Sequence, residues 1–232
     1  DMVSYWRTVL GCGFLAIVPA ANDSVLCVTK SGDVFQVNVN ELEAGGFKFR
    51  AEDSMKLPEG LSTPLRAVAL TGGKLAIAHG GREPKVRIVN QIGKFEQEFP
   101  IEEGPTSNLV PLGAGVVVPL KTKLRTVGIP NVPRVDDFLA AVGANANGSA
   151  WSSVLSLDAS HIAFVDPEGK LSRLEYRTLP KPSLQQLDSV ALGQPADVQP
   201  IVDKTRMIVA DAGGTLRVFS AARFERVAEA KL

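Results

Sequence analysis

Cysteine, histidine and aromatic residues are scarce in this chain. Its 232 residues hold 2 Cys, 2 His, 2 Trp and 2 Tyr, and aromatic side chains make up 6% of the total. With so few cysteines, the sequence does not indicate a redox compartment. Cys12 and Cys27 flank adjacent predicted strands, so they could form a disulfide. The alternative is that Cys27 serves as a small apolar residue inside a buried strand.

Charge of one sign and long apolar runs are also missing. The 25 basic residues balance 25 acidic ones, which argues against a nucleic-acid partner, because a phosphate-binding surface needs clustered Lys and Arg. Lys121, Lys123 and Arg125 come close together, and we interpret them as a solvated edge. No run is long enough to cross a bilayer, and the N-terminus lacks the regions of a signal peptide. Because the chain begins at Asp1 without Met, we expect a processed product or an excised domain.

Patterns that support catalysis are not found either. His79 and His161 have no neighbouring Cys or acidic cluster in metal-ligand spacing, and we expect both to be solvated ends of strands. No glycine-rich segment leads from a strand into a helix, and no serine sits in a nucleophile-elbow pattern. The sequence therefore predicts no catalytic residues, metal site or cofactor site, and no enzyme.

A repeat is what the sequence does contain. An apolar run, a tight polar turn and an alternating apolar run recur five times, and each copy is typical of a β-hairpin. These predicted hairpins lie near residues 25–37, 75–89, 116–127, 162–174 and 207–219. The first aliphatic residue after each turn recurs every ~45 residues, which is the period of a four-stranded propeller blade. These markers are Val34, Val86, Leu124, Leu171 and Leu216.

The period leaves room for two more strands in each repeat. A short apolar strand precedes each hairpin, and a more polar strand follows each one, such as residues 94–99 or 223–227. An apolar-to-polar gradient is the radial order of a propeller blade, whose inner strands are buried on both faces. We therefore predict an all-β fold, a β-propeller of four-stranded antiparallel blades forming one domain over residues 1–232. A β-sandwich is the alternative.

Several positions interrupt or mark the repeat. Residues 133–142 predict a helical turn or a distorted outer strand, and residues 143–149 predict a loop of small residues. Asp166 and Asp211 occupy the same place in two copies, which favours a turn-forming role. Trp6 and Trp151 stand near inner strands, where each could stack in the core or anchor a partner.

The hairpin phrase resembles that of a known family. Residues 166–171 and 211–216, each preceded by an apolar strand, are similar to the repeat of pyrroloquinoline-quinone-like β-propellers. This family includes quinone-dependent alcohol dehydrogenases and a non-catalytic lipoprotein of outer-membrane protein assembly. The common tryptophan of the repeat is replaced here by Phe95 or Phe224, and the adjacent cysteines and calcium-binding acids of the enzymes have no match. The resemblance therefore implies the fold, the non-catalytic branch and an extracytoplasmic or periplasmic location.

The number of repeats leaves the architecture open between two forms. Five repeats fit a five-bladed ring or part of a larger propeller of seven or eight blades, because both ends of the chain offer an outer strand. An open arc would expose strand edges and apolar faces, and we would then expect self-association.

Three functions are compatible with such a scaffold. The first is a non-catalytic module that binds a protein or peptide through its loop face. The second is a cofactor- or sugar-binding enzyme of quinoprotein type with a site in the central channel, and the third is a structural spacer of a larger protein. The candidate partner-binding residues are Arg82, Glu83, Asn145, Asn147 and Trp151.

Overall fold

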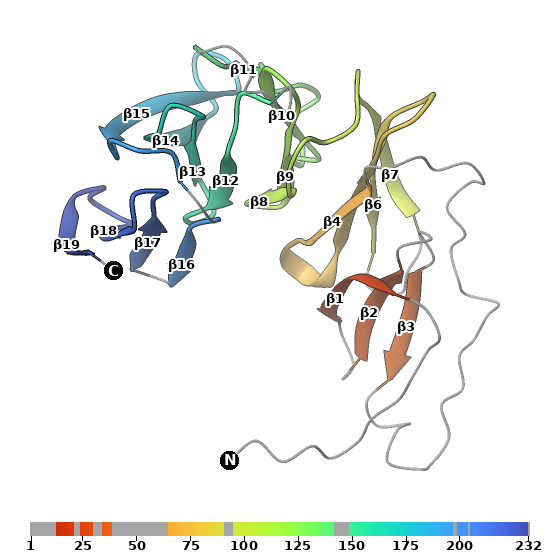
Figure 1. Cartoon of the computed structure of the whole chain (residues 1–232). Coiled ribbons are helices and arrows are strands. Elements are labelled where there is room, and N and C mark those ends of the chain that lie inside the picture. The colour runs from red at the N-terminus through yellow and green to blue at the C-terminus, as the bar shows by residue number, and fades with distance from the viewer. Residues whose placement is uncertain are drawn as a thin grey trace. The chain divides into compact units, whose positions relative to one another are not determined.

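The computed structural model describes residues 13–20, 24–29, 34–38, 65–90, 95–141, 149–196, 199–203 and 205–231. The chain divides into two compact units, Asp1–Gly104 and Pro105–Leu232. The described residues form antiparallel sheets (Figure 1), and the only helical element among them is a 3-10 turn, Thr71–Gly73. Within these ranges there is no helix with the length and apolarity needed to span a membrane.

The first unit contains two sheets. The strands of the first sheet are β1 (Phe14–Ala20), β2 (Ser24–Thr29) and β3 (Val34–Asn38). Those of the second are β4 (Leu65–Ala69), β5 (Leu75–His79), β6 (Lys85–Val89) and β7 (Phe95–Pro100). Each strand pairs with the next one along the chain. The core between the sheets is aliphatic and includes Leu26, Val28, Leu75 and Ile77.

The second unit contains three sheets of four strands, again in chain order. The first holds β8 (Val110–Leu112), β9 (Gly115–Pro119), β10 (Lys123–Val127) and β11 (Phe138–Leu139). The second holds β12 (Ser153–Ser156), β13 (His161–Val165), β14 (Lys170–Arg177) and β15 (Ser183–Ala191). The third holds β16 (Ile201–Asp203), β17 (Arg206–Ala210), β18 (Thr215–Ser220) and β19 (Arg226–Lys231).

The inner strands are apolar because both of their faces are covered. On β13, Ile162 and Phe164 pack into a core shared with β8 and β9, whereas Ala163 and Val165 pack into a second core shared with β17 and β18. Alternate residues of a strand point to opposite faces, so a strand between two cores reads as a continuous apolar run. The outer strand β19 is exposed at all six residues, as the predicted radial gradient requires.

All five predicted hairpins are present, as β2–β3, β5–β6, β9–β10, β13–β14 and β17–β18. Of the segment 133–142, the described residues 133–141 form a distorted outer strand, in which only Phe138 and Leu139 pair with β10. The single domain over 1–232 and the choice between ring and arc stay predictions. Cys27 is buried, with 5% of its surface exposed. Cys12 and Trp6 lie outside the described residues.

Candidate functional site

Turns and connectors gather at one end of the sheets in the second unit. In a sheet whose strands follow chain order, the turn between the second and third strands lies at the same end as the connector to the next sheet. We call this end the turn face. It comprises turns 120–122, 166–169 and 211–214, with connectors 140–152 and 192–200, of which 142–148 and 197–198 lie outside the described residues.

Backbone hydrogen bonds fasten each connector to these turns. The Ala140 amide donates to the Thr122 carbonyl at 2.8 Å, and the Ala150 amide donates to the Lys121 carbonyl at 2.7 Å. The second connector is held at its first residues by two bonds. The amide of Leu192 donates to the Gly169 carbonyl at 2.8 Å, and the amide of Ala212 donates to the Pro195 carbonyl at 2.9 Å. The connector between β15 and β16 therefore bridges the turns of two neighbouring sheets.

Two buried aspartates shape the turns of this face, as the sequence predicts. Asp166 Oδ1 accepts the amides of Glu168 at 3.0 Å and Lys170 at 2.8 Å. Asp211 Oδ1 accepts the amides of Gly213 at 3.0 Å and Thr215 at 2.9 Å. Each aspartate has only 4% of its surface exposed. A carboxylate that accepts two amides holds a turn in one conformation.

Asp211 has a second partner that Asp166 lacks. Arg217 Nη1 donates to Asp211 Oδ2. This guanidinium, together with the amides of Thr215 and Gly213, lowers the pKa of Asp211 from its usual value, although burial opposes the shift. The last turn is therefore fixed by a carboxylate that stays ionised at neutral pH.

Trp151 holds the first connector from beneath. Its side chain is in the core, with 2% exposed, and its Nε1 donates to the Leu120 carbonyl at 2.6 Å. The ring meets Phe164 edge-on, with centroids 5.1 Å apart at an interplanar angle of 84°. The expectation that Trp151 stacks in the core is confirmed. Because its indole is buried, Trp151 is not an exposed anchor, and this corrects its place among the candidate partner contacts.

The other predicted contact residues lie in two different regions. Arg82 and Glu83 are exposed in the turn between β5 and β6 of the first unit, where Glu83 Oε2 lies 3.3 Å from Lys85 Nζ. Asn145 and Asn147 belong to the first connector of the turn face but lie outside the described residues. The role of these four residues in binding stays a prediction.

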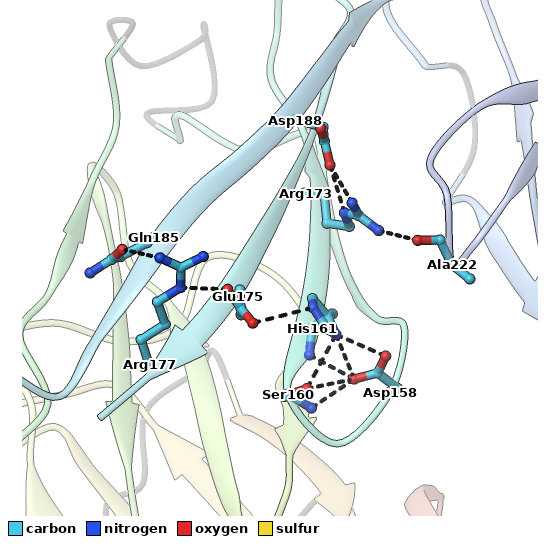
Figure 2. A network of polar contacts seen from close by, with 9 residues as sticks. All are labelled: Asp158, Ser160, His161, Arg173, Glu175, Arg177, Gln185, Asp188 and Ala222. Carbon is cyan, nitrogen blue, oxygen red and sulfur yellow. Dashed lines mark hydrogen bonds and ion pairs between the residues drawn. The ribbon is translucent and has the colours of Figure 1, made fainter. Parts of the chain in front are cut away.

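The opposite end of the second unit carries a polar network around His161 (Figure 2). Asp158 Oδ1 accepts the backbone amides of Ser160 at 2.8 Å and His161 at 2.9 Å, and it lies 2.9 Å from His161 Nδ1. Burial raises the pKa of Asp158, but these amides and the imidazole outweigh it and lower that pKa overall. His161 Nε2 is 3.9 Å from Oε1 of Glu175. The other carboxylate oxygen of Glu175, Oε2, forms an ion pair with Arg177.

This network shapes a turn and does not form a catalytic triad. A triad needs a base that contacts the nucleophile through one ring nitrogen and the orienting acid through the other. Ser160 Oγ and the Asp158 carboxylate both approach Nδ1 of His161 (Figure 2). Among the described residues, no group of three or more His, Cys, Asp or Glu side chains could hold a metal ion.

His79 is buried and corrects a second expectation. It was predicted to be a solvated strand end, but only 6% of its surface is exposed. Its Nδ1 is 2.8 Å from the Gly80 carbonyl, which can only accept, so Nδ1 carries the proton. Nε2 is buried and has no hydrogen-bond partner among the residues that the structure describes. Burial lowers the pKa of His79, with Arg87 and Lys85 acting in the same direction.

An arginine–carboxylate pair that the sequence did not lead us to expect recurs in the four sheets that have four described strands. In each sheet an arginine on the third strand donates to an acid on or next to the fourth strand. The pairs are Arg87–Glu98, Arg125–Asp137, Arg173–Asp188 and Arg217–Glu229. These pairs fasten each outer strand to its sheet. The signal available in the sequence was a basic residue one or two places after the aliphatic markers Val86, Leu124, Leu171 and Leu216.

The pair on β10 corrects a third expectation. Arg125 Nε and Nη2 donate to the two oxygens of Asp137 at 3.0 and 2.7 Å, and Lys123 Nζ lies 3.1 Å from the same carboxylate. The side chains of Lys123 and Arg125 are 22% and 19% exposed. The prediction of a solvated edge was therefore wrong for these two residues, while Lys121 is exposed.

Arg173 extends the same motif to the neighbouring sheet. It binds Asp188 on β15 and also donates to the Ala222 carbonyl in the turn between β18 and β19 (Figure 2). Its guanidinium carbon lies 5.5 Å from the ring centroid of Phe224. Phe224 is 3% exposed. Arg173 and Phe224 thus join the last two sheets.

Comparison with known proteins identifies the fold. No family model and no curated protein matches the sequence. BamB from Moraxella catarrhalis superposes with a TM-score of 0.65 at 16% identity, over 100% of this chain and 64% of that one. The Swd1 β-propeller domain from Myceliophteria thermophila gives 0.63 at 15% identity, over 92% and 67%. The Pan2 WD40 domain from Neurospora crassa gives 0.60 at 11% identity, over 92% and 64%.

These similarities show a fold and not a family. The chain is an all-β protein with the β-propeller fold, built from four-stranded antiparallel blades. The sheets described above are its blades, and their turns and connectors are the loops of a propeller face. The chain spans about two thirds of the length of these structural neighbours.

Proposed function

We propose that this chain is a non-catalytic propeller module that binds a protein or a peptide through the turn face. The observation that carries the proposal is the fixed backbone of that face. Asp166, Asp211 and Trp151 hold the turns and the connector from below, while side chains at the tips point outward. A surface that is ordered before binding loses little conformational entropy when a partner docks.

The chemistry of the tips favours a polypeptide partner. Glu168 and Ala212 are exposed on neighbouring turns and Gln194 is exposed on the connector between them. They present one acid, one small apolar group and one amide. Gly193 and Gly213 lie beside them and leave backbone amides and carbonyls accessible to a partner. Such a mixed, weakly charged surface suits hydrogen bonding to a peptide backbone. It lacks the basic cluster that phosphate recognition needs.

The other sequence candidates lie in an equivalent turn of the first unit and in the first connector of the turn face. Arg82 and Glu83 occupy the turn between the second and third strands of their blade, which is the equivalent of turns 166–169 and 211–214. Asn145 and Asn147 belong to the connector whose described ends are fastened to Lys121 and Thr122. We propose these four residues as further partner contacts. Trp151 contributes by fixing the connector.

We also propose that the chain belongs to the non-catalytic branch of the pyrroloquinoline-quinone-like propellers, with an extracytoplasmic location. The hairpin phrases at residues 166–171 and 211–216 support this assignment, and so does the fold shared with BamB. The branch would be distinguished from WD40 propellers by a profile built from homologues of this chain.

The test compares protein capture by two triple variants. One alters the turn face and the other alters the opposite end of the blades. The turn-face variant combines Glu168→Arg, Gln194→Arg and Ala212→Arg. The control combines Ala159→Arg, Thr178→Arg and Ala222→Arg, which are exposed positions at the opposite end. Wild type and control should capture the same protein from a native lysate, and the turn-face variant should not.

Other outcomes would assign a different function. Equal capture by both variants would remove the turn face as the binding surface. No captured protein at all would favour a structural spacer or a channel-bound small molecule. Thermal stabilisation by pyrroloquinoline quinone with calcium would then favour the enzyme of quinoprotein type.

A further inference from the structure

His79 is a buried imidazole with one ring nitrogen that lacks a partner. It is the last residue of β5, and its Nδ1 donates to the Gly80 carbonyl at 2.8 Å. Its Nε2 is buried without a hydrogen-bond partner among the described residues. Because Nδ1 already carries the proton of the neutral ring, a second proton must bind at Nε2. That proton would create a buried cation, and burying a charge without a partner is costly.

The charged groups on the neighbouring strands make this cation less favourable still. His79 lies opposite Lys85 on β6, and Arg87 follows two residues later on the same face of that strand. Both cations already bind Glu98 of β7, because Lys85 Nζ lies 2.9 Å from its Oε1 and Arg87 Nε donates to its Oε2 at 2.7 Å. Burial is the main reason that the pKa of His79 is lowered, and Arg87 and Lys85 act in the same direction. The Gly80 carbonyl and Glu98 oppose this shift.

The other strands packed around His79 offer no free carboxylate. Arg66, the charged residue of β4, alternates with the residue opposite His79 and so lies on the other face. Across the core of the first unit stand β1 and β2, which contain no Asp, Glu, Lys, Arg or His. The second acid of β7, Glu96, is paired with Lys74 at 2.7 Å. Among the described residues of these strands, a protonated His79 therefore has no acid to compensate its charge.

The same imidazole fastens the start of the turn between β5 and β6. Gly80, the first residue of the turn, is buried and accepts the proton of Nδ1, whereas Arg82 and Glu83 are exposed. Glu83 Oε2 lies 3.3 Å from Lys85 Nζ, so this carboxylate is engaged by another cation. The bond from His79 to Gly80 is thus a side-chain contact that ties the turn to the core.

We propose that the turn between β5 and β6 is acid-sensitive, because a proton on His79 Nε2 is accommodated only when the imidazole leaves the core and the turn opens. The charged ring then reaches water, and its bond to the Gly80 carbonyl breaks. The turn carries Arg82 and Glu83, so contacts that these residues make with a partner would weaken in acid. This last consequence rests on the proposed function, whereas the opening of the turn does not.

The other histidine of the chain provides an internal control. Histidine is the side chain that ordinarily changes charge between about pH 5 and 8, and the chain has 2 of them. His161 Nδ1 lies 2.9 Å from Asp158 Oδ2, and Nε2 lies 3.9 Å from Glu175 Oε1 (Figure 2). A protonated His161 therefore has a carboxylate beside each ring nitrogen. Acid should not open the turn that precedes His161.

Hydrogen exchange of the full chain without a partner tests the proposal at about pH 7.5 and about pH 5.5, after correction for the intrinsic pH dependence of amide exchange. One proton that binds the open form with a pKa of about 6.5 and does not bind the closed form raises the opening constant about tenfold over this interval. Residues 79–86 should therefore lose protection by up to about tenfold in acid, while residues 157–161 keep theirs.

Two variants assign the effect to one histidine. His79→Gln keeps an amide donor for the Gly80 carbonyl but has no site for a proton, so the acid-induced loss of protection should disappear. His161→Gln is the matched control and should retain the loss. Should His79→Gln fail to fold, titration of the His79 ring protons by NMR in the wild-type chain replaces it. The midpoint of that titration should coincide with the pH at which residues 79–86 lose protection.

Four results would overturn the proposal. The first is unchanged protection of residues 79–86 in acid. The second is a loss that spreads evenly over both units, because acid would then destabilise the whole chain. The third is a loss that persists in His79→Gln, and the fourth is a ring titration whose midpoint differs from that of the exchange, because in both cases another group would be responsible. None of these results depends on a partner, so they leave the proposed function to its own test.

Discussion

Replacing Gly169 by alanine should destabilise the second unit far more than the same change at Gly193. Both glycines have left-handed backbones, with φ of 80° at Gly169 and 84° at Gly193. They differ in their surroundings. A Cβ on Gly169 would collide with the Gln194 carbonyl oxygen and lie 2.5 Å from its carbon, whereas a Cβ on Gly193 would meet nothing within 4 Å.

The magnitudes follow from this difference. Both variants lose about 1–2 kcal/mol because an L-residue is strained in the left-handed region. Gly169→Ala adds a collision between two backbone segments, and overpacking of this kind costs about 1–3 kcal/mol or more. We therefore expect Gly169→Ala to be less stable than Gly193→Ala by about 1–3 kcal/mol. For a chain of this size that difference lowers the melting temperature by about 2–12 °C.

The assay is unfolding in urea and by heat, followed by circular dichroism in both variants and wild type. Gly113→Ala gives an intermediate point, because its φ is 57° and its Cβ would lie 3.3 Å from the Ala159 carbonyl oxygen. If Gly169→Ala and Gly193→Ala lose equal stability, the connector does not pack on the turn, and the account of a fixed turn face fails.

Three further predictions concern the buried polar groups. Trp151→Phe should lower the free energy of unfolding by about 1–3 kcal/mol in urea titrations, because the Leu120 carbonyl loses its donor; an unchanged midpoint would contradict this. A double-mutant cycle of Arg125→Met and Asp137→Asn should give a coupling free energy of about 1–2 kcal/mol. The exposed pair Arg226–Glu229 should give less than about 0.5 kcal/mol, and equal couplings would refute the prediction that burial strengthens the Arg125–Asp137 pair. Burial lowers the pKa of His79 in the folded chain, so the imidazole binds a proton more readily in the unfolded chain. The contribution of His79 to the free energy of unfolding should therefore be constant above pH 6.5 and decrease as the pH drops below that value. His79→Gln should lose part of this fall in the urea midpoint between pH 8 and 5.5, and identical pH profiles would show that His79 is not the group responsible.

The blades could be predicted from the sequence because their signals are local. A turn phrase such as residues 211–214 and the alternation on either side of it depend only on neighbouring residues. The aspartates of the turns could be assigned for the same reason, since an acceptor two to four residues from its donors needs no tertiary information. Whether Trp151 lies in the core or anchors a partner could not be decided in this way, because its place before an inner strand is compatible with both.

The pairs and burials that were missed depend on register between strands. Arg87 meets Glu98 because the two stand opposite each other on β6 and β7, and the sequence does not state that register. His79 was placed in solvent because it ends a strand, but it lies opposite Leu65 on one side and Lys85 on the other. Lys123 and Arg125 looked like a basic edge because their partner, Asp137, comes from the distorted segment 133–142.

The most direct test of the central claim is hydrogen exchange of the chain with and without a partner captured as described above. The account predicts that the partner slows exchange in turns 120–122, 166–169 and 211–214 and in connector residues 192–196. The turns at the opposite end, residues 157–160 and 221–225, should be unaffected. Protection confined to the opposite end would contradict the assignment of the turn face as the binding surface.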